Sequence, residues 1–143
     1  MREYTYAFGA VCPFDGASDF LILPNMDSPN MNIFLQEISQ RHQDRNILIF
    51  MDGAASHRSK ETHLTIPSNI HIEILPPYSP DLNPTENIWD EMREKFFKNT
   101  VFDSMDAVEE QLALACRYFE MTPEKVQSIT GFDWIVSNLK NAS

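Results

Sequence analysis

The chain has 143 residues, of which 43% are hydrophobic and 11% aromatic, with only 4 glycines. This length and composition predict one packed globular domain spanning residues 1–143 and exclude a disordered or fibrous protein. The formal net charge is −10, from 11 basic and 21 acidic residues. Proteins that hold duplex DNA unaided usually present a basic face, so we expect this chain to bind DNA only weakly alone.

The cysteines and the apolar segments predict a cytoplasmic protein. Cys12 and Cys116 are far apart and lack metal-ligand spacing, which favours buried free thiols in a reducing compartment. The first residues do not resemble a signal peptide, and no apolar run is long enough for a transmembrane helix.

The first forty residues predict a hairpin followed by a helix. Residues 4–11 alternate as a strand, residues 13–16 (Pro-Phe-Asp-Gly) form a turn signal, and residues 20–23 supply a second strand. Ser28 is expected to cap a helix that has Pro29 in its first position and ends near residue 41. Its apolar face is predicted to contain Met31, Phe34, Leu35 and Ile38.

The middle of the chain predicts an α/β arrangement in which helices cover a mixed sheet. Residues 47–51 are five consecutive apolar residues, a pattern typical of a strand buried on both faces. Residues 57–64 are expected to form a short helix, and residues 70–75 alternate as another strand.

The C-terminal half predicts three helices. In the first, Asn83 is the expected N-cap and Pro84 the first helical residue, and the apolar face contains Ile88, Trp89, Met92 and Phe96. A longer helix begins near Ser104, and a last one runs from residues 122–123 to about residue 131. The longer helix has apolar residues at helical spacing, namely Met105, Val108, Leu112, Cys116 and Phe119.

Two acids stand where the predicted elements change. Asp52 follows the buried strand directly, a common position for functional groups in α/β proteins, although Asp52-Gly53 also fits a simple turn. Glu86 lies three residues after Asn83, so a capping box is its alternative explanation. The proline-rich loop between the elements can bring the two acids together, which favours a joint role.

That joint role is metal binding. Mg²⁺ prefers oxygen ligands and is commonly held by a few carboxylates together with substrate phosphate. Two such ions, about 3.5 to 4 Å apart, can activate a nucleophile and stabilise the leaving oxygen in phosphodiester displacement. Asp52 and Glu86 are a minimal cradle for them, and most such sites need a third acid.

Four further residues are candidates for contacts with substrate or with the ligand carboxylates. Capping of a short helix explains His57 about as well, and the simplest role of Trp89 is to anchor its helix in the core. Asn83 is also explained by its role as a helix cap. The role of Tyr78 is open. Its loop also contains a PxxP spacing, which is common by chance.

These residues carry a resemblance to a known family. Asp52-Gly53-Ala54 with His57, followed by residues 75–86 (LPPYSPDLNPTE) with Trp89, resembles the catalytic half of the Asp-Asp-Glu (DDE) transposases. The similar branch is the mariner superfamily's bacterial insertion-sequence relatives. The resemblance extends from about Tyr4 to Trp134.

The resemblance implies a ribonuclease H-like fold with a mixed sheet flanked by helices. It implies an enzyme that nicks transposon ends and joins them to target DNA, using Mg²⁺ or Mn²⁺. Asp52 would be the second acid and Glu86 the third, both catalytic and both metal ligands. The family often has Asn after the second acid, where this chain has Gly53.

The upstream part departs from the family pattern. The family's first acid lies on a strand that precedes the hairpin, and neither Asp15 nor Asp19 matches it. We therefore expect an N-terminally truncated catalytic domain, from a truncation or a split reading frame, that lacks the first strand and the DNA-binding region and is inactive alone. An unfilled slot in the sheet favours association as a homodimer or with full-length transposase.

Two other functions stay open. One is a non-catalytic module that pairs with full-length transposase and inhibits or completes it. The other is a metal hydrolase that uses Asp52, His57 and Glu86 on a small substrate.

Overall fold

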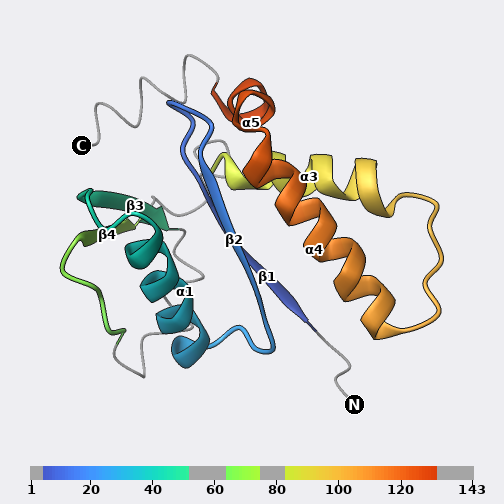
Figure 1. Ribbon diagram of the computed structural model, residues 1–143, viewed down its shortest axis with the longest axis horizontal. Coiled ribbons are helices and arrows are strands. Elements are labelled where there is room, and N and C mark those ends of the chain that lie inside the picture. Colours follow the sequence, from blue (N-terminus) through green and yellow to red (C-terminus); the bar gives the residue numbers. More distant parts are fainter. Residues whose placement is uncertain (1–4, 52–63, 75–82, 132–143) are drawn as a thin grey trace. The chain divides into compact units, whose positions relative to one another are not determined.

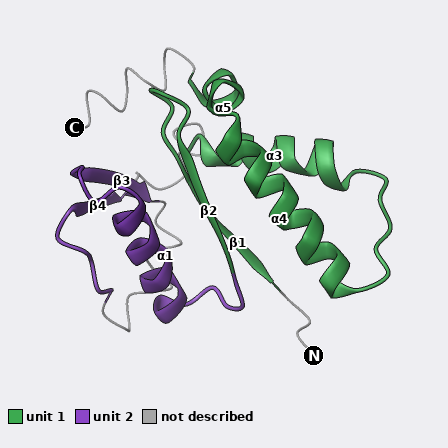
Figure 2. Cartoon of the chain, viewed as in Figure 1, with its two compact units in different colours: residues 1–22, 80–143 green, residues 23–79 purple. Residues whose placement is uncertain are grey.

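The computed structural model describes residues 5–51, 64–74 and 83–131. The chain divides into two compact units (Figure 2). Unit 1 comprises Met1–Ile22 and Pro80–Ser143, and unit 2 comprises Leu23–Ser79. The described elements form two small sheets and several helices, a mixed α/β architecture (Figure 1). Among the described residues, no helix is both long and apolar enough to cross a membrane.

A β-hairpin opens the described chain, as the sequence predicted. Strand β1 (Tyr6–Val11) hydrogen-bonds to strand β2 (Ser18–Leu23). In the turn, the Gly16 N–H donates to the Cys12 carbonyl at 2.8 Å, and Gly16 has a φ of +80°, which favours glycine. A side chain there would also collide with helix α5 (Pro123–Thr130), because a Cβ atom would lie 1.8 Å from the Pro123 carbonyl oxygen. The hairpin tip is therefore shaped to fit against that helix.

The described part of unit 1 also contains four helical elements. Helix α3 (Thr85–Met92) continues into the π-helix η2 (Arg93–Phe97), and helix α4 (Met105–Met121) is followed by α5. The Ser104 hydroxyl caps α4 by accepting from the Ala107 N–H at 3.1 Å, as expected for an N-cap serine. Helices α3, α4 and α5 match the three helices predicted from the sequence, whereas the π-helix η2 was not predicted.

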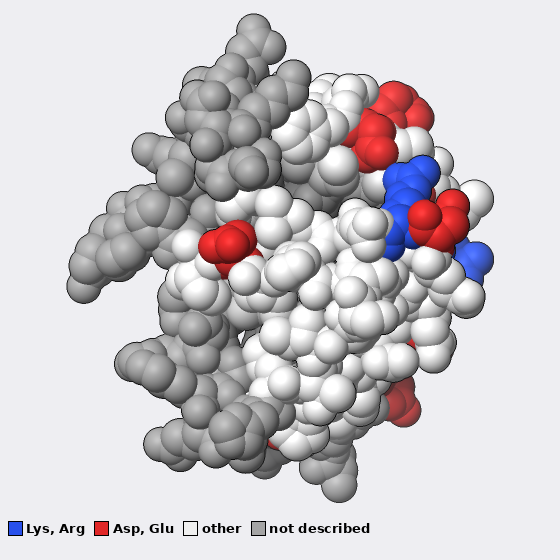
Figure 3. Space-filling view, turned by 90° about the vertical axis from the view of Figure 1, so that its left-hand side faces the viewer, with Lys and Arg blue, Asp and Glu red and all other residues white. Residues whose placement is uncertain are grey.

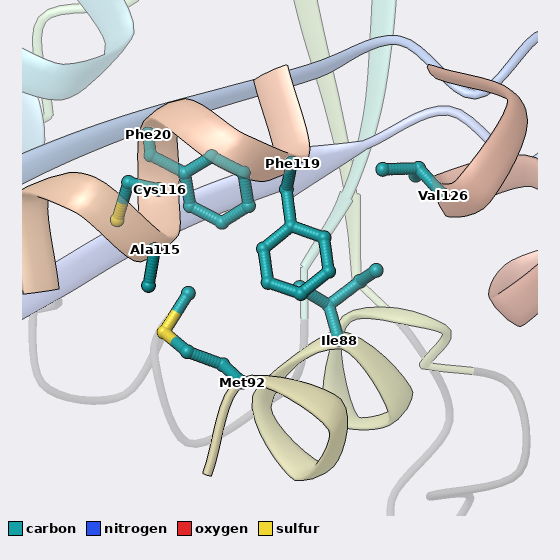
Figure 4. Close-up of a cluster of buried hydrophobic side chains, with 7 residues drawn as sticks. All are labelled: Phe20, Ile88, Met92, Ala115, Cys116, Phe119 and Val126. Atoms are coloured by element: carbon teal, nitrogen blue, oxygen red, sulfur yellow. The ribbon is translucent and has the colours of Figure 1, made fainter. Parts of the chain in front are cut away.

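The core of unit 1 joins the hairpin to these helices (Figure 4). Phe119 of α4 and Ile88 of α3 are fully buried and lie next to each other, and α5 contributes the equally buried Val126. The complete cluster consists of Phe20, Ile88, Met92, Ala115, Cys116, Phe119 and Val126. Ile88, Met92, Cys116 and Phe119 lie on apolar faces that helical periodicity predicted. Phe20 comes from β2, and Ala115 and Val126 were not predicted from the sequence.

The two cysteines are free thiols. Cys116 is buried, and desolvation, with a smaller contribution from the nearby Glu120 carboxylate, raises its pKa to about 12. Cys12 is half-buried, and burial also raises its pKa. Both thiols therefore stay protonated at neutral pH and are weak candidates for metal ligation.

Unit 2 contains helix α1 (Ser28–Arg41) and the parallel strands β3 (Ile47–Met51) and β4 (Ile70–Ile74). The predicted N-cap of α1 is wrong by one residue. Asp27, rather than Ser28, adopts the extended cap conformation and accepts from the Asn30 N–H at 3.0 Å, while Ser28 is the first helical residue. Asp and Ser are comparable caps, so the choice between neighbours depends on the backbone rather than on residue type.

The face of α1 predicted to be apolar is buried, whereas strand β3 is only partly buried. The prediction that β3 is buried on both faces is wrong, because Leu48 is 41% exposed. Leu48 lies opposite His71 in the parallel register, and His71 and Glu73 on the same face are also exposed. Phe50, on the same face, is half-buried, so this face of the strand pair is covered only in part. The predicted helix over residues 57–64 lies largely outside the described residues.

Asn69 connects the end of α1 to the strands through hydrogen bonds. Its side-chain oxygen accepts from the Ser39 hydroxyl at 2.6 Å, and its amide nitrogen donates to the carbonyls of His42 and Arg45 at 3.3 and 3.2 Å. Its own carbonyl accepts from the Ile47 N–H at 2.7 Å, which starts the pairing of β3 with β4. The Asn69 side chain thus provides hydrogen-bond partners for backbone carbonyls in the loop that connects α1 to β3.

Replacing this side chain should destabilise the protein. We expect Asn69→Ala to lower the free energy of unfolding by about 1–3 kcal/mol, because it leaves several part-buried polar groups without partners. Urea denaturation followed by circular dichroism measures the change. Gln43→Ala, an exposed amide in the same loop, is the control and should have little effect. Equal stability of the two variants would contradict the role of Asn69.

Candidate metal site at the start of helix α3

The described residues place three of the six candidate site residues. Asn83, Glu86 and Trp89 lie together at the start of α3 in unit 1. Asp52, His57 and Tyr78 lie outside the described residues. Strand β3 ends at Met51, so Asp52 follows its carboxyl end directly in the sequence.

Asn83 shapes the first turn of α3. Its side-chain oxygen accepts from the Thr85 N–H at 3.2 Å, and its carbonyl accepts from the Glu86 N–H at 3.2 Å. The helix proper begins at Thr85, with Pro84 as the residue immediately before it, one position later than predicted. The capping role predicted for Asn83 is therefore partly met, through a bond to an N–H two residues ahead.

The Glu86 carboxylate is free for a ligand within the described part of the chain. Its side chain is exposed, and among the described residues its carboxylate accepts no hydrogen bond, which excludes the capping box with Asn83. Glu86 lies in the first turn of α3. Its oxygen atoms are the kind of ligand that Mg²⁺ and Mn²⁺ prefer.

One carboxylate does not make a metal site. The described residues contain no group of three or more His, Cys, Asp or Glu side chains that could hold an ion. Glu86 is thus suited to bind a divalent ion, because it is a carboxylate and because it accepts no hydrogen bond from the described residues. The other ligands of a complete cradle would have to include residues outside the described ranges, of which Asp52 is the predicted one.

Trp89 packs in the core of unit 1, as its simplest interpretation predicted. Its ring meets that of Phe20 edge-on, with the centroids 5.7 Å apart, and it is partly buried against the core cluster. Strand β1 approaches the same place through Gly9, where a Cβ atom would lie 2.8 Å from Cη2 of Trp89. Sequence reasoning missed Gly9, although a glycine inside a strand pattern is a known signal of close approach.

The cations near α3 are already engaged with other groups. Arg93 pairs with Asp90, and Lys98 pairs with Glu94 at 2.8 Å. Lys95 lies 4.9 Å from the centre of the Tyr118 ring. Figure 3 shows one face of the molecule, on which the few visible blue atoms form one small group beside red ones.

The chain belongs to a family of nucleases. Residues 2–109 match the family model of the DDE superfamily endonucleases. The chain is also 35% identical over 132 residues to the uncharacterized protein y4pE/y4sA of Sinorhizobium fredii (strain NBRC 101917 / NGR234), an alignment that covers 92% of this chain and 96% of that protein. No solved structure matches the chain. Membership of the DDE superfamily supports a transposase-like nuclease function, and endonucleases of this kind generally use divalent metal ions.

The cap of α3 can be tested directly. We expect Asn83→Ala to lower the free energy of unfolding by about 1 kcal/mol, because the Thr85 N–H loses its acceptor. Asn83→Asp keeps an acceptor oxygen and should retain most of the stability. Urea denaturation of the three proteins makes the comparison. If the aspartate variant were as destabilised as the alanine variant, the hydrogen bond to Thr85 would not be the stabilising interaction.

Proposed function

We propose that the chain is part of a DNA transposase of the mariner superfamily's bacterial insertion-sequence branch, with a ribonuclease H-like fold. The observation that carries the proposal is the exposed Glu86 carboxylate, which accepts no hydrogen bond from the described residues. It lies on the first turn of a core-anchored helix, within residues that match the endonuclease family. The reaction is nicking at transposon ends and joining of the freed 3′ hydroxyl to target DNA.

In this proposal Asp52 and Glu86 hold the catalytic metal. Both would be ligands of Mg²⁺ or Mn²⁺, which, when bound, supplies the Lewis acid for phosphodiester displacement. Asn83 would fix the helix start that carries Glu86, and Trp89 would fix the helix against the core. His57 and Tyr78 remain candidates for contacts with the DNA.

We further propose that these two acids need a third ligand from elsewhere. Asp15, the acid in the hairpin turn, is engaged locally, since its carboxylate accepts from the Ala17 N–H at 2.9 Å. It is therefore a poor substitute for the family's first acid. The chain would then act together with another protein chain rather than alone, and the transposon and target DNA would be bound mainly by that assembly.

One observation favours the alternative of a non-catalytic module that pairs with full-length transposase. Each described sheet contains two strands, and two-stranded sheets are marginally stable without further partners. The β3–β4 pair is parallel, a type that normally occurs inside larger covered sheets. A strand from a second copy or from a full-length transposase would complete such a sheet.

The metal site is tested by a double-mutant cycle. We expect Glu86→Gln and Asp52→Asn each to weaken Mn²⁺ binding, and the double variant to be little worse than either single one, because both acids hold the same ion. Titration calorimetry provides the dissociation constants. Glu110→Gln, a change at an exposed acid of α4, is the control.

Strand-transfer assays then separate the two functions. With Mn²⁺ and DNA carrying the sequences that flank its gene, the chain alone should give no joined product. If a partner supplies the missing acid, adding a full-length transposase that lacks its own catalytic Glu should restore the joined product. If the chain is a non-catalytic module, adding it to intact transposase should inhibit strand transfer. Strand transfer by the chain alone, abolished in Asp52→Ala, would contradict the need for a third ligand.

A further inference from the structure

Gly9 lies at the point where strand β1, strand β2 and helix α3 come together in unit 1. A Cβ atom at this position would lie 2.7 Å from Cε1 and 2.9 Å from Cδ1 of Phe20, and 2.8 Å from Cη2 of Trp89. Such distances are shorter than carbon atoms tolerate without movement. The absence of a side chain at Gly9 is therefore a condition for the two aromatic rings to lie where they do.

Glycine is costly inside a strand, so this position calls for an explanation. A glycine in a strand interior weakens the strand through backbone entropy and leaves no side chain to pack. Here the compensation is the edge-on packing of Trp89 on Phe20, with the centroids 5.7 Å apart. Close aromatic pairs of this kind contribute stability beyond the area they bury. The close approach of α3 to β1 thus depends on Gly9.

Trp89 transmits this contact to Glu86. The two residues are three positions apart on α3, so their side chains are neighbours on one face of the helix. Ile88 and Met92 are buried on the core side of the same helix, which limits its rotation. The depth to which the indole reaches against β1 therefore sets where the first turn of α3, and with it the Glu86 carboxylate, lies.

We propose that Gly9 is a positioning residue for Glu86: its missing side chain lets Trp89 lie against β1, and this contact holds the carboxylate where it binds a metal ion. The inference rests on the proposed metal site and adds a residue to it that touches neither metal nor DNA. Groups that hydrogen-bond to metal ligands typically change metal affinity by about 10- to 100-fold when mutated, and we expect the lower end of that range for a steric contact such as this one.

The test measures Mn²⁺ affinity of the intact chain from the electron paramagnetic resonance signal of the free ion. We expect Gly9→Ala, which adds one methyl group, to raise the dissociation constant about tenfold or more. Trp89→Phe removes the ring that carries Cη2 without introducing a clash, so it should fold and also weaken binding. The double variant Gly9→Ala/Trp89→Phe should recover much of the Mn²⁺ affinity, because the Phe20 ring can move into the space that the indole leaves.

Gly131→Ala is the matched control. Its methyl group would lie 2.6 Å from the Gln127 carbonyl oxygen and 2.9 Å from the Pro13 carbonyl oxygen, a comparable crowding away from Trp89. We expect a lower melting temperature in both glycine variants and unchanged Mn²⁺ affinity in Gly131→Ala. Circular dichroism confirms that each variant is folded.

The outcomes separate the two proposals. If Glu86→Gln weakens Mn²⁺ binding while folded Gly9→Ala and Trp89→Phe bind like the wild type, the positioning role is overturned and the metal site stands. The same conclusion follows if Gly131→Ala loses as much affinity as Gly9→Ala, or if the double variant shows no recovery. If Glu86→Gln binds Mn²⁺ like the wild type, the metal site itself fails, and the positioning role fails with it.

Discussion

The packing of Phe20 is the interaction on which the described part of unit 1 depends. Its ring, on β2, is 4% exposed and contacts Trp89 of α3 and Phe119 of α4, with centroids 5.7 and 6.4 Å away. Its backbone N–H donates to the Glu120 carboxylate at 2.9 Å. One residue thus joins the hairpin to two helices through both its side chain and its backbone. The helix that carries Glu86 is held by this aromatic contact, by the buried side chains of Ile88 and Met92, and by an ion pair at 3.6 Å between its Glu91 and Lys125 of α5.

Local patterns in the sequence were sufficient to predict most elements of this arrangement. The Asp-Gly turn defined the hairpin, and the glycine at its tip has the positive φ that such turns require. Apolar residues at helical spacing identified the buried faces of α1, α3 and α4, with Ile38, Ile88 and Phe119 all nearly or fully buried. These features depend on residues close in sequence, so a single sequence contains them.

Features set by contacts between distant residues were not predictable in the same way. Leu48 looked buried because it belongs to an apolar run, but its exposure depends on what covers that face of the strand pair. The π-turn of η2 follows from tertiary packing, where Gln111 of α4 donates to the Phe96 carbonyl at 2.9 Å. At the proposed site, motif spacing pointed to Glu86, whereas Gly9 is 77 positions away and its contact with Trp89 appears only in the fold.

The charge distribution limits how a metal site of this kind can work. With a net charge of −10, the chain as a whole repels anions, including the phosphates of DNA. The nearby cations Arg93 and Lys98 already pair with acids of their own helical segment, so they do little to relieve this repulsion. In the proposed site a divalent ion has to neutralise the acids before the DNA backbone can approach. Metal binding and assembly of the site are then one coupled event, and a contact that fixes Glu86 in advance, such as that of Trp89 with Gly9, lowers the entropy lost in that event.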